Sequence, residues 1–169
     1  MAVTPPAPVM ALLRELDRPE VPRLRWTTPD QWHVTLRFLG EVDPPGPVAA
    51  GLAGVPAGLA AVGAPGVEAV LGPSLAWFPG RQVLQVPVAG LDALAGAVAE
   101  ATAPWGPPPE RPFAGHLTLA RMRGRARGPA RLAGTALSAA WPVDRVELVS
   151  STMASGGSRY RTEASVVLA

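Results

Sequence analysis

Both histidines of this chain lie in the same short pattern, His-x-Thr-Leu. His33 stands in WHVTLRFL (32–39), and His116 stands in GHLTLARM (115–122). In the first segment apolar and polar residues alternate, which is typical of a β-strand with one buried face and one polar face. The polar face is expected to carry His33, Thr35 and Arg37. Any fold of this chain must therefore accommodate two strands that each present an imidazole and a hydroxyl on the same face.

The predicted elements around the two patterns repeat in the same order: helix, His-containing strand, helix, two strands. We interpret this order as an internal duplication, with approximate halves 1–88 and 89–169 of a single bilobal domain spanning 1–169. The short MAV segment at 1–3 is predicted to be the remnant of a strand. Helices are predicted at 10–16, 48–62, 91–103 and 129–138, strands at 66–73 and 81–88, and a terminal hairpin at 143–152 and 158–168.

Composition excludes several classes of protein. The net charge is only +2, although all fifteen basic residues are arginines, so the overall charge says little about nucleic-acid binding. The absence of cysteine excludes disulfides and thiolate metal sites. No segment is long and apolar enough to span a membrane, and no secretory signal is visible. We therefore expect a cytoplasmic monomer.

The two repeated patterns together carry the groups for acid–base chemistry. Residues i and i+2 of a strand lie about 6.6 Å apart on one face, so each imidazole has a hydroxyl neighbour. Two imidazoles titrate near neutral pH, so one can accept a proton while the other donates one. Two threonine hydroxyls can donate hydrogen bonds to anionic oxygens, which suits attack on a phosphodiester. Two histidines without a third ligand do not form a recognisable zinc site, and no Gly-x-Ser-x-Gly pattern occurs.

The chain resembles the two-histidine phosphoesterase superfamily, defined by paired His-x-Thr/Ser (HxTx) motifs, and within it the RNA 2',3'-cyclic phosphodiesterases, also called 2'-5' RNA ligase-like proteins. The segments that carry the resemblance are LRWTTPDQWHVTLRFLGEV (24–42), WFPGRQVLQVPV (77–88), FAGHLTLARM (113–122) and VELVSSTMASGGSRY (146–160). The resemblance implies an α+β fold with two similar lobes, each an antiparallel sheet with flanking helices, related by a pseudo-two-fold axis about a central cleft.

The resemblance also implies an activity and roles for particular residues. The activity is hydrolysis of a terminal 2',3'-cyclic phosphate of RNA to a 2'-phosphate, without a metal or other cofactor. His33 would be the proton donor and His116 the proton acceptor, while Thr35 and Thr118 would hold the phosphate oxygens. The expected partner is RNA with a 2',3'-cyclic phosphate end, or a nucleotide substrate.

Three further residues are candidates for substrate binding: Arg121, Tyr160 and Ser151. Arg121 matches a basic residue that the family carries after its second motif, but strand alternation places it opposite His116 unless a β-bulge re-aims it. Tyr160 and Ser151 lie in the terminal hairpin, where cross-strand packing is an alternative role for the tyrosine. The loop RMRGRARG (121–128) is either a field that attracts RNA or a solvated turn.

Other functions remain open at this stage. The same site could act on a small cyclic nucleotide or on ADP-ribose cyclic phosphate, or could catalyse 2'-5' RNA ligation. A different class of function is a non-catalytic RNA-binding module that uses the arginine loop and the cleft.

Overall fold

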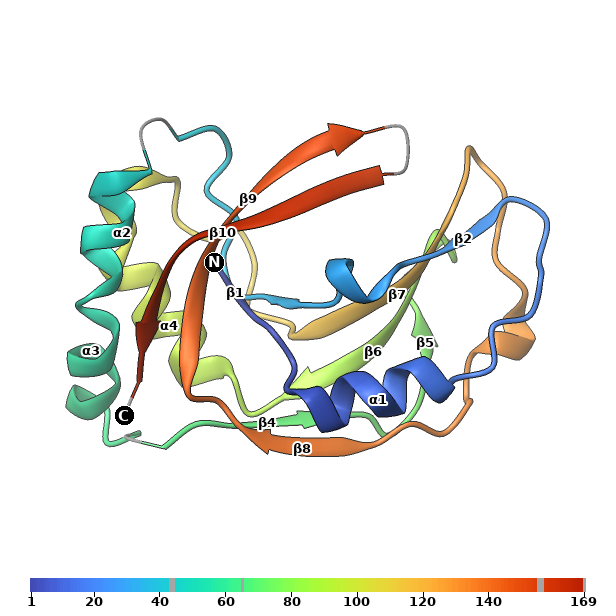
Figure 1. The fold of residues 1–169 in the computed structure, drawn as a ribbon, viewed down its shortest axis with the longest axis horizontal. Helices are drawn as coiled ribbons and strands as arrows, with labels where there is room; N and C mark the ends of the chain where they lie inside the picture. The colour runs from blue at the N-terminus through green and yellow to red at the C-terminus, as the bar shows by residue number, and fades with distance from the viewer. Residues whose placement is uncertain (43–44, 65, 155–156, 169) are drawn as a thin grey trace.

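A computed structural model describes residues 1–42, 45–64, 66–154 and 157–168 of the chain. It has an α+β fold in which an antiparallel sheet is flanked by helices (Figure 1). The helices are α1 (Ala7–Glu15), α2 (Gly46–Leu52), α3 (Val55–Ala61) and α4 (Asp92–Ala101). The strands are β1 (Ala2–Val3), β2 (Leu24–Trp26), β3 (Val34–Thr35), β4 (Glu68–Leu71), β5 (Ala76–Trp77), β6 (Val83–Ala89), β7 (His116–Met122), β8 (Ala139–Pro142), β9 (Arg145–Ala154) and β10 (Gly157–Val167). Three short 3₁₀ turns lie at Pro29–Gln31, Ala103–Trp105 and Ala130–Leu132.

The strands follow the order β10-β9-β1-β3-β7-β6-β4-β8, with β2 beside β7 and β5 beside β6. The two strands that carry the His-x-Thr patterns, β3 and β7, are neighbours at the middle of this order. On the β3 side lie β1 from the start of the chain and the β9–β10 hairpin from its end. On the β7 side, β6 and β4 come from the first half of the chain and β8 from the second. Each predicted half, 1–88 and 89–169, therefore contributes strands to both sides of the β3–β7 junction.

Three of the helices form one group. In Figure 1, α2, α3 and α4 gather on one side of the molecule, and α1 lies apart from them. α2 and α3 pack against α4, and α2 also contacts β10. Within the described residues, no helix combines the length and the hydropathy that a membrane crossing requires.

Side-chain alternation in the His-containing strands produces the core. Val34 of β3 and Leu117 of β7 are completely buried, as are Leu84 and Val86 of the adjacent β6. Burying an aliphatic side chain of this size contributes about 1.5–3 kcal/mol. The buried face therefore fixes the orientation of both strands and leaves the imidazoles and hydroxyls on the opposite face.

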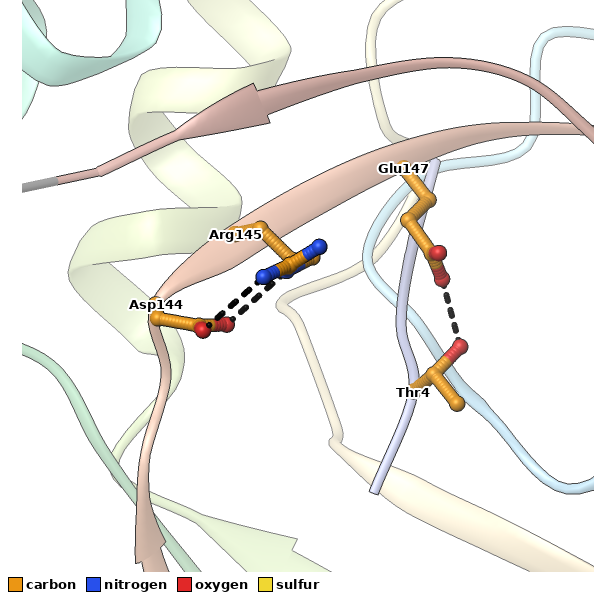
Figure 2. Close-up of polar contacts among 4 residues, drawn as sticks. All are labelled: Thr4, Asp144, Arg145 and Glu147. Carbon is orange, nitrogen blue, oxygen red and sulfur yellow. Dashed lines mark hydrogen bonds and ion pairs between the residues drawn. The ribbon is translucent and has the colours of Figure 1, made fainter. Parts of the chain in front are cut away.

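The N-terminal MAV segment, predicted as the remnant of a strand, forms a short strand inside the sheet. β1 pairs with β3 on one side and with β9 on the other. Just after β1, Thr4 donates a hydrogen bond to the carboxylate of Glu147 in β9, and the Asp144–Arg145 ion pair lies at the start of β9 (Figure 2). The pairings of β1 and the Thr4–Glu147 hydrogen bond connect the β9–β10 hairpin to the His33 strand, whereas the Asp144–Arg145 pair joins two exposed neighbours in the chain.

Two predicted helices differ from the structure. The segment 48–62 forms two helices, α2 and α3, separated at Ala53 and Gly54. The prediction of a helix at 129–138 is wrong, because only a 3₁₀ turn forms at Ala130–Leu132. Gly134 then adopts φ +84°, and the backbone of Gly134 and of the next residue hydrogen-bonds to the backbone of Leu75. Tertiary backbone pairing thus overrides the helical pattern of Ala and Leu in this segment.

Arg37 does not share the polar face with His33 and Thr35, contrary to the strand alternation. β3 ends at Thr35, and the chain then turns into the interior. The Arg37 side chain is only 6% exposed. Its guanidinium donates hydrogen bonds to the Thr102 hydroxyl and to three backbone carbonyls, those of residues 99, 106 and 107. Arg37 therefore connects the end of the His33 strand to the C-terminal end of α4.

Candidate active site

The register between β3 and β7 brings the two His-x-Thr patterns face to face. Val34 lies opposite Leu117 in an antiparallel ladder. This register places His33 beside Thr118 and Thr35 beside His116, all on the face opposite the two buried residues. Directly opposed residues have Cβ atoms about 5 Å apart, and diagonal neighbours are about 7–8 Å apart. The imidazoles thus occupy one diagonal of a compact square, and the hydroxyls occupy the other.

A cavity of about 340 Å³ lies over this square. Its walls come from β2, the turn before β3, β7 and the β9–β10 hairpin. None of the described residues that line it is Asp or Glu, so its charged and titratable side chains are arginines and histidines, together with one tyrosine. Such a lining favours an anionic ligand. The lining residues are Arg25, Trp26, Thr27, Gln31, His33, Thr35, His116, Thr118, Arg121, Met122, Arg123, Met153, Gly157, Ser158 and Tyr160.

Each imidazole is held by an aromatic edge contact. The His33 and Tyr160 rings meet edge to face with centroids 4.6 Å apart, and the Phe78 and His116 rings do so at 4.8 Å. His116 also places Nδ1 2.9 Å from the backbone carbonyl of Ala114. If Nδ1 donates its proton there, the other nitrogen, Nε2, of a neutral His116 is a proton acceptor.

The pKa of His33 is lowered from its ordinary value. Burial, which disfavours the charged imidazolium, is the largest cause. The backbone of Gln31 opposes it by raising the pKa, and the positive charge of His116 lowers it further. A free imidazole at position 33 is therefore easily deprotonated, and an anion bound in the cavity would favour its protonated form.

Neighbouring residues hold the square in shape. Thr27 donates through its backbone and its hydroxyl to the carbonyl of Leu119 in β7, and Trp32 donates to the same hydroxyl. Gln31 accepts a hydrogen bond from the Thr28 backbone and donates one to Ser158 of the hairpin. The hydroxyls of Thr35 and Thr118 make no hydrogen bond within the described residues, which leaves them available to a ligand.

A β-bulge in β7 re-aims Arg121. Thr118 lies opposite Gln85, but Ala120 lies opposite Leu84, so Leu119 is an extra residue on β7. Leu119 and Ala120 are consequently both buried. After the bulge Arg121 returns to the face of Thr118 and lines the cavity.

The structure places Tyr160 and Ser151, the two candidates in the terminal hairpin, at different cavities. Tyr160 lines the cavity and contacts His33. Ser151, although paired with Tyr160 in the hairpin, lines a different cavity, so the structure does not bring it to the His–Thr square. From the arginine loop, Arg121 and Arg123 reach the cavity, and Arg125 is exposed outside it.

Some lining residues were not anticipated from the sequence. Arg25 and Met153 belong to segments quoted for the resemblance, but no local pattern distinguishes them, because they reach the cavity only through tertiary pairing. A metal centre is not evident in residues 1–42, 45–64, 66–154 and 157–168. Those residues contain no cluster of three or more His, Cys, Asp or Glu side chains positioned to hold a metal ion.

Comparisons with known proteins agree with this geometry. The model of the family described as LigT like Phosphoesterase matches residues 3–68, which include the His33 pattern. The solved structure of protein TT0787 of Thermus thermophilus superposes with a TM-score of 0.79 at 27% identity, covering 99% of this chain and 95% of that one. The chain is therefore similar to LigT-like phosphoesterases, in sequence over its first part and in fold over nearly its whole length.

Two structures of E. coli LigT extend the similarity over both His–Thr strands. LigT complexed with NADP+ matches with a TM-score of 0.68, and LigT complexed with 3'-AMP with 0.69. Both are 25% identical to this chain, and each match covers 99% of this chain and 94% of LigT. No curated protein sequence matches the chain significantly.

Proposed function

We propose that this chain is a LigT-like phosphoesterase that hydrolyses the terminal 2',3'-cyclic phosphate of RNA to a 2'-phosphate. One observation carries the proposal: the register that sets Val34 opposite Leu117 and joins both His-x-Thr patterns into one square beneath a cavity lined without carboxylates. Such a site combines two proton-transfer groups with two hydrogen-bond donors for an anion.

The mechanism follows from the arrangement of these groups. Thr35 and Thr118 donate hydrogen bonds to the non-bridging oxygens of the cyclic phosphate. His116 accepts a proton from a water molecule through Nε2 while that water forms a bond to phosphorus. The bond between phosphorus and the 3'-oxygen breaks, and His33 donates its proton to that oxygen. The product carries a 2'-phosphate and a free 3'-hydroxyl, and the next turnover requires proton exchange between the imidazoles and solvent.

The fold assigns matching surroundings to the two imidazoles. β1 and β6 flank the two His-containing strands, α1 and α4 precede those strands in the chain, and each imidazole meets one aromatic edge. These correspondences support the proposal that two lobes of one bilobal domain are related by a pseudo-two-fold axis through the square. Such symmetry leaves the two roles interchangeable by geometry, and the assignment of His33 as proton donor and His116 as proton acceptor is part of this proposal.

The nucleotide character of the substrate has separate support. E. coli LigT has been crystallised with NADP+, with ATP and with 3'-AMP. A cavity of about 340 Å³ lies in the size range of small-molecule sites. The same chemistry on a small cyclic nucleotide therefore remains the second candidate.

The test is product identity. A short RNA ending in a 2',3'-cyclic phosphate and the corresponding cyclic mononucleotide are incubated with the protein in excess EDTA, and the products are separated by chromatography. We expect a 2'-phosphate in both cases, with the higher kcat/KM on RNA. A 3'-phosphate product, or dependence on added metal, would contradict the mechanism. Binding of RNA without turnover would instead identify a binding module, and preference for the mononucleotide would favour the second candidate.

A further inference from the structure

Arginines and acidic residues are separated along this chain. No aspartate or glutamate occurs in the segments 21–29, 69–91 and 111–143, which make up less than half of the chain but hold nine of its fifteen arginines. The fold brings the three segments together, because β7 pairs with β2 on one part of its length and with β6 along the other edge. The positive charge of these strands is therefore not offset by any carboxylate on the same strands.

Four exposed arginines gather where the acid-free strands end. Arg23 precedes β2, and Arg123, Arg125 and Arg127 follow β7 in the arginine loop 121–128. None of the four takes part in an ion pair within the described residues. We call these four residues the arginine surface. Figure 1 shows β2 toward the end of the molecule opposite α2 and α3, so the arginine surface lies away from those helices.

Backbone hydrogen bonds hold the arginine loop in place. The N–H of Arg123 donates to the carbonyl of Arg23, and the N–H of Gly128 donates to the carbonyl of Arg81, at 2.8 Å each. Both acceptor residues are strained: Arg23 has φ +66° and Arg81 has φ +55°, and among the described residues they are the non-glycine residues with positive φ. Strain of this kind persists only where surrounding contacts hold it, and it is concentrated at functional sites. The loop is thus ordered before any ligand binds, which lowers the entropic cost of binding.

The arginine surface continues the wall of the cavity. Arg123 belongs to the surface and also lines the cavity above the His–Thr square. Thr118 and Arg123 are five residues apart along the chain, which corresponds to roughly 16 Å in a strand. The internal phosphate of a dinucleotide whose cyclic phosphate lies on the square falls well short of this distance. A longer RNA continues past Arg123 onto the arginine surface.

We infer that the arginine surface binds phosphates of the RNA chain on the 5' side of the cyclic end, so that the preferred substrate is an oligonucleotide of at least several nucleotides. The inference rests on the proposed function, because the cyclic phosphate fixes the end of the RNA on the His–Thr square. Contacts to phosphates carry no direct information on the bases. The surface therefore selects the length of the RNA and not its sequence.

The kinetic test compares an octanucleotide with a dinucleotide, both ending in a 2',3'-cyclic phosphate, so that contacts inside the cavity are common to the two substrates. Each phosphate contact on a single strand contributes about 0.7 to the slope of the logarithm of affinity against the logarithm of salt concentration. With about three phosphates neutralised, the octanucleotide-to-dinucleotide ratio of kcat/KM should fall about 20-fold between about 50 and 200 mM salt.

Paired substitutions test whether the arginines cause this salt dependence. Arg125→Gln combined with Arg127→Gln should leave a fall of only about threefold over the same salt range. Arg125→Lys combined with Arg127→Lys keeps both charges and should restore the wild-type fall. The matched control combines Arg14→Gln with Arg145→Gln, which removes two exposed arginines outside the surface and should behave as the wild type does.

Several outcomes would overturn the inference. One is a ratio near one in the wild type at low salt. Another is a glutamine variant that loses activity equally on both substrates, because the arginines would then serve the fold or the reaction itself. A control variant with the same reduced salt dependence would assign the effect to net charge, and lysines that do not restore it would assign the effect to the shape of the loop.

Binding separates this inference from the proposed hydrolysis. Fluorescence anisotropy with an octanucleotide that ends in a 2'-phosphate measures affinity without turnover. The slope of log Kd against log salt should be about 1.4 smaller in the glutamine variant than in the wild type. That difference without any turnover of the cyclic substrates would reject hydrolysis and keep the surface, whereas turnover with equal slopes would keep hydrolysis and reject the surface. Equal slopes together with arginine-dependent sedimentation on phosphatidylserine vesicles would assign the surface to a membrane instead.

Discussion

The buried guanidinium of Arg37 allows a test of how the His33 strand is anchored. Arg37 follows β3 by two residues and donates hydrogen bonds to the Thr102 hydroxyl at 2.9 Å and to the carbonyls of Gly106 and Pro107 at 2.9 Å each, besides that of Ala99. No carboxylate pairs with it among the described residues. Arg37→Met keeps most of the side-chain volume but removes every donor, so these acceptors lose their partner.

The expected magnitude follows from these contacts. A hydrogen bond from a charged donor contributes about 1.5–3 kcal/mol, but the desolvation of the guanidinium offsets part of the sum. Three of the four acceptors are only partly buried and regain some hydration when the arginine is lost. We therefore expect Arg37→Met to lower the free energy of unfolding by about 3–4 kcal/mol. For a chain of 169 residues this corresponds to a fall in melting temperature of roughly 6–16 °C.

Thermal unfolding followed by circular dichroism and urea titration measures this change. Arg14→Met, which removes an exposed arginine, is the matched control and should change the melting temperature by less than about 2 °C. Arg37→Lys should fall between the wild type and Arg37→Met, because an ammonium cannot reach all four acceptors at once. An Arg37→Met protein as stable as the control would refute the reasoning.

Three further outcomes are expected. In His116→Ala, the residual activity should fall as pH rises, with a midpoint below about pH 6.5. A proton donor must be protonated to act, and burial lowers the pKa of His33. Residual activity that rises with pH would instead make His33 the proton acceptor. Gln85→Met should raise the melting temperature by roughly 2–4 °C, since Oε1 of Gln85 is buried without a hydrogen-bond partner within the described residues and losing it is worth about 1 kcal/mol. Gly157→Ala should lower the melting temperature, measured by thermal unfolding, because a methyl group there collides with the Arg25 guanidinium and the φ of +103° strains alanine.

The sequence predicts the centre of this molecule better than its periphery. His33, Thr35, His116 and Thr118 could be singled out because a strand alternates its faces regardless of where it sits in the fold. The burial of Val34 and Leu117 follows the same rule. Side-chain alternation alone does not predict the register that makes the two strands neighbours, because strand pairing depends on the whole sheet.

The differences occur where tertiary structure overrides a local pattern. Arg37 leaves the predicted face because β3 ends two residues earlier, and a bulge at Leu119 returns Arg121 to the cavity. The predicted helix at 129–138 yields to backbone pairing with Leu75. Arg25 gives no local signal at all, because its place in the cavity wall depends on a cross-strand neighbour and on a glycine far along the chain.

The most direct test of the account is a double-mutant cycle of kcat/KM on an RNA with a 2',3'-cyclic phosphate end, using His33→Ala, His116→Ala and the double variant. We expect each single variant to lose about 10²–10⁴-fold, because proton transfer by one positioned group contributes that much. The kcat/KM of the double variant should be no more than about tenfold below that of the less active single variant, because the two imidazoles act on the same step. Wild-type rates in either single variant, or losses that multiply in the double variant, would contradict a shared site.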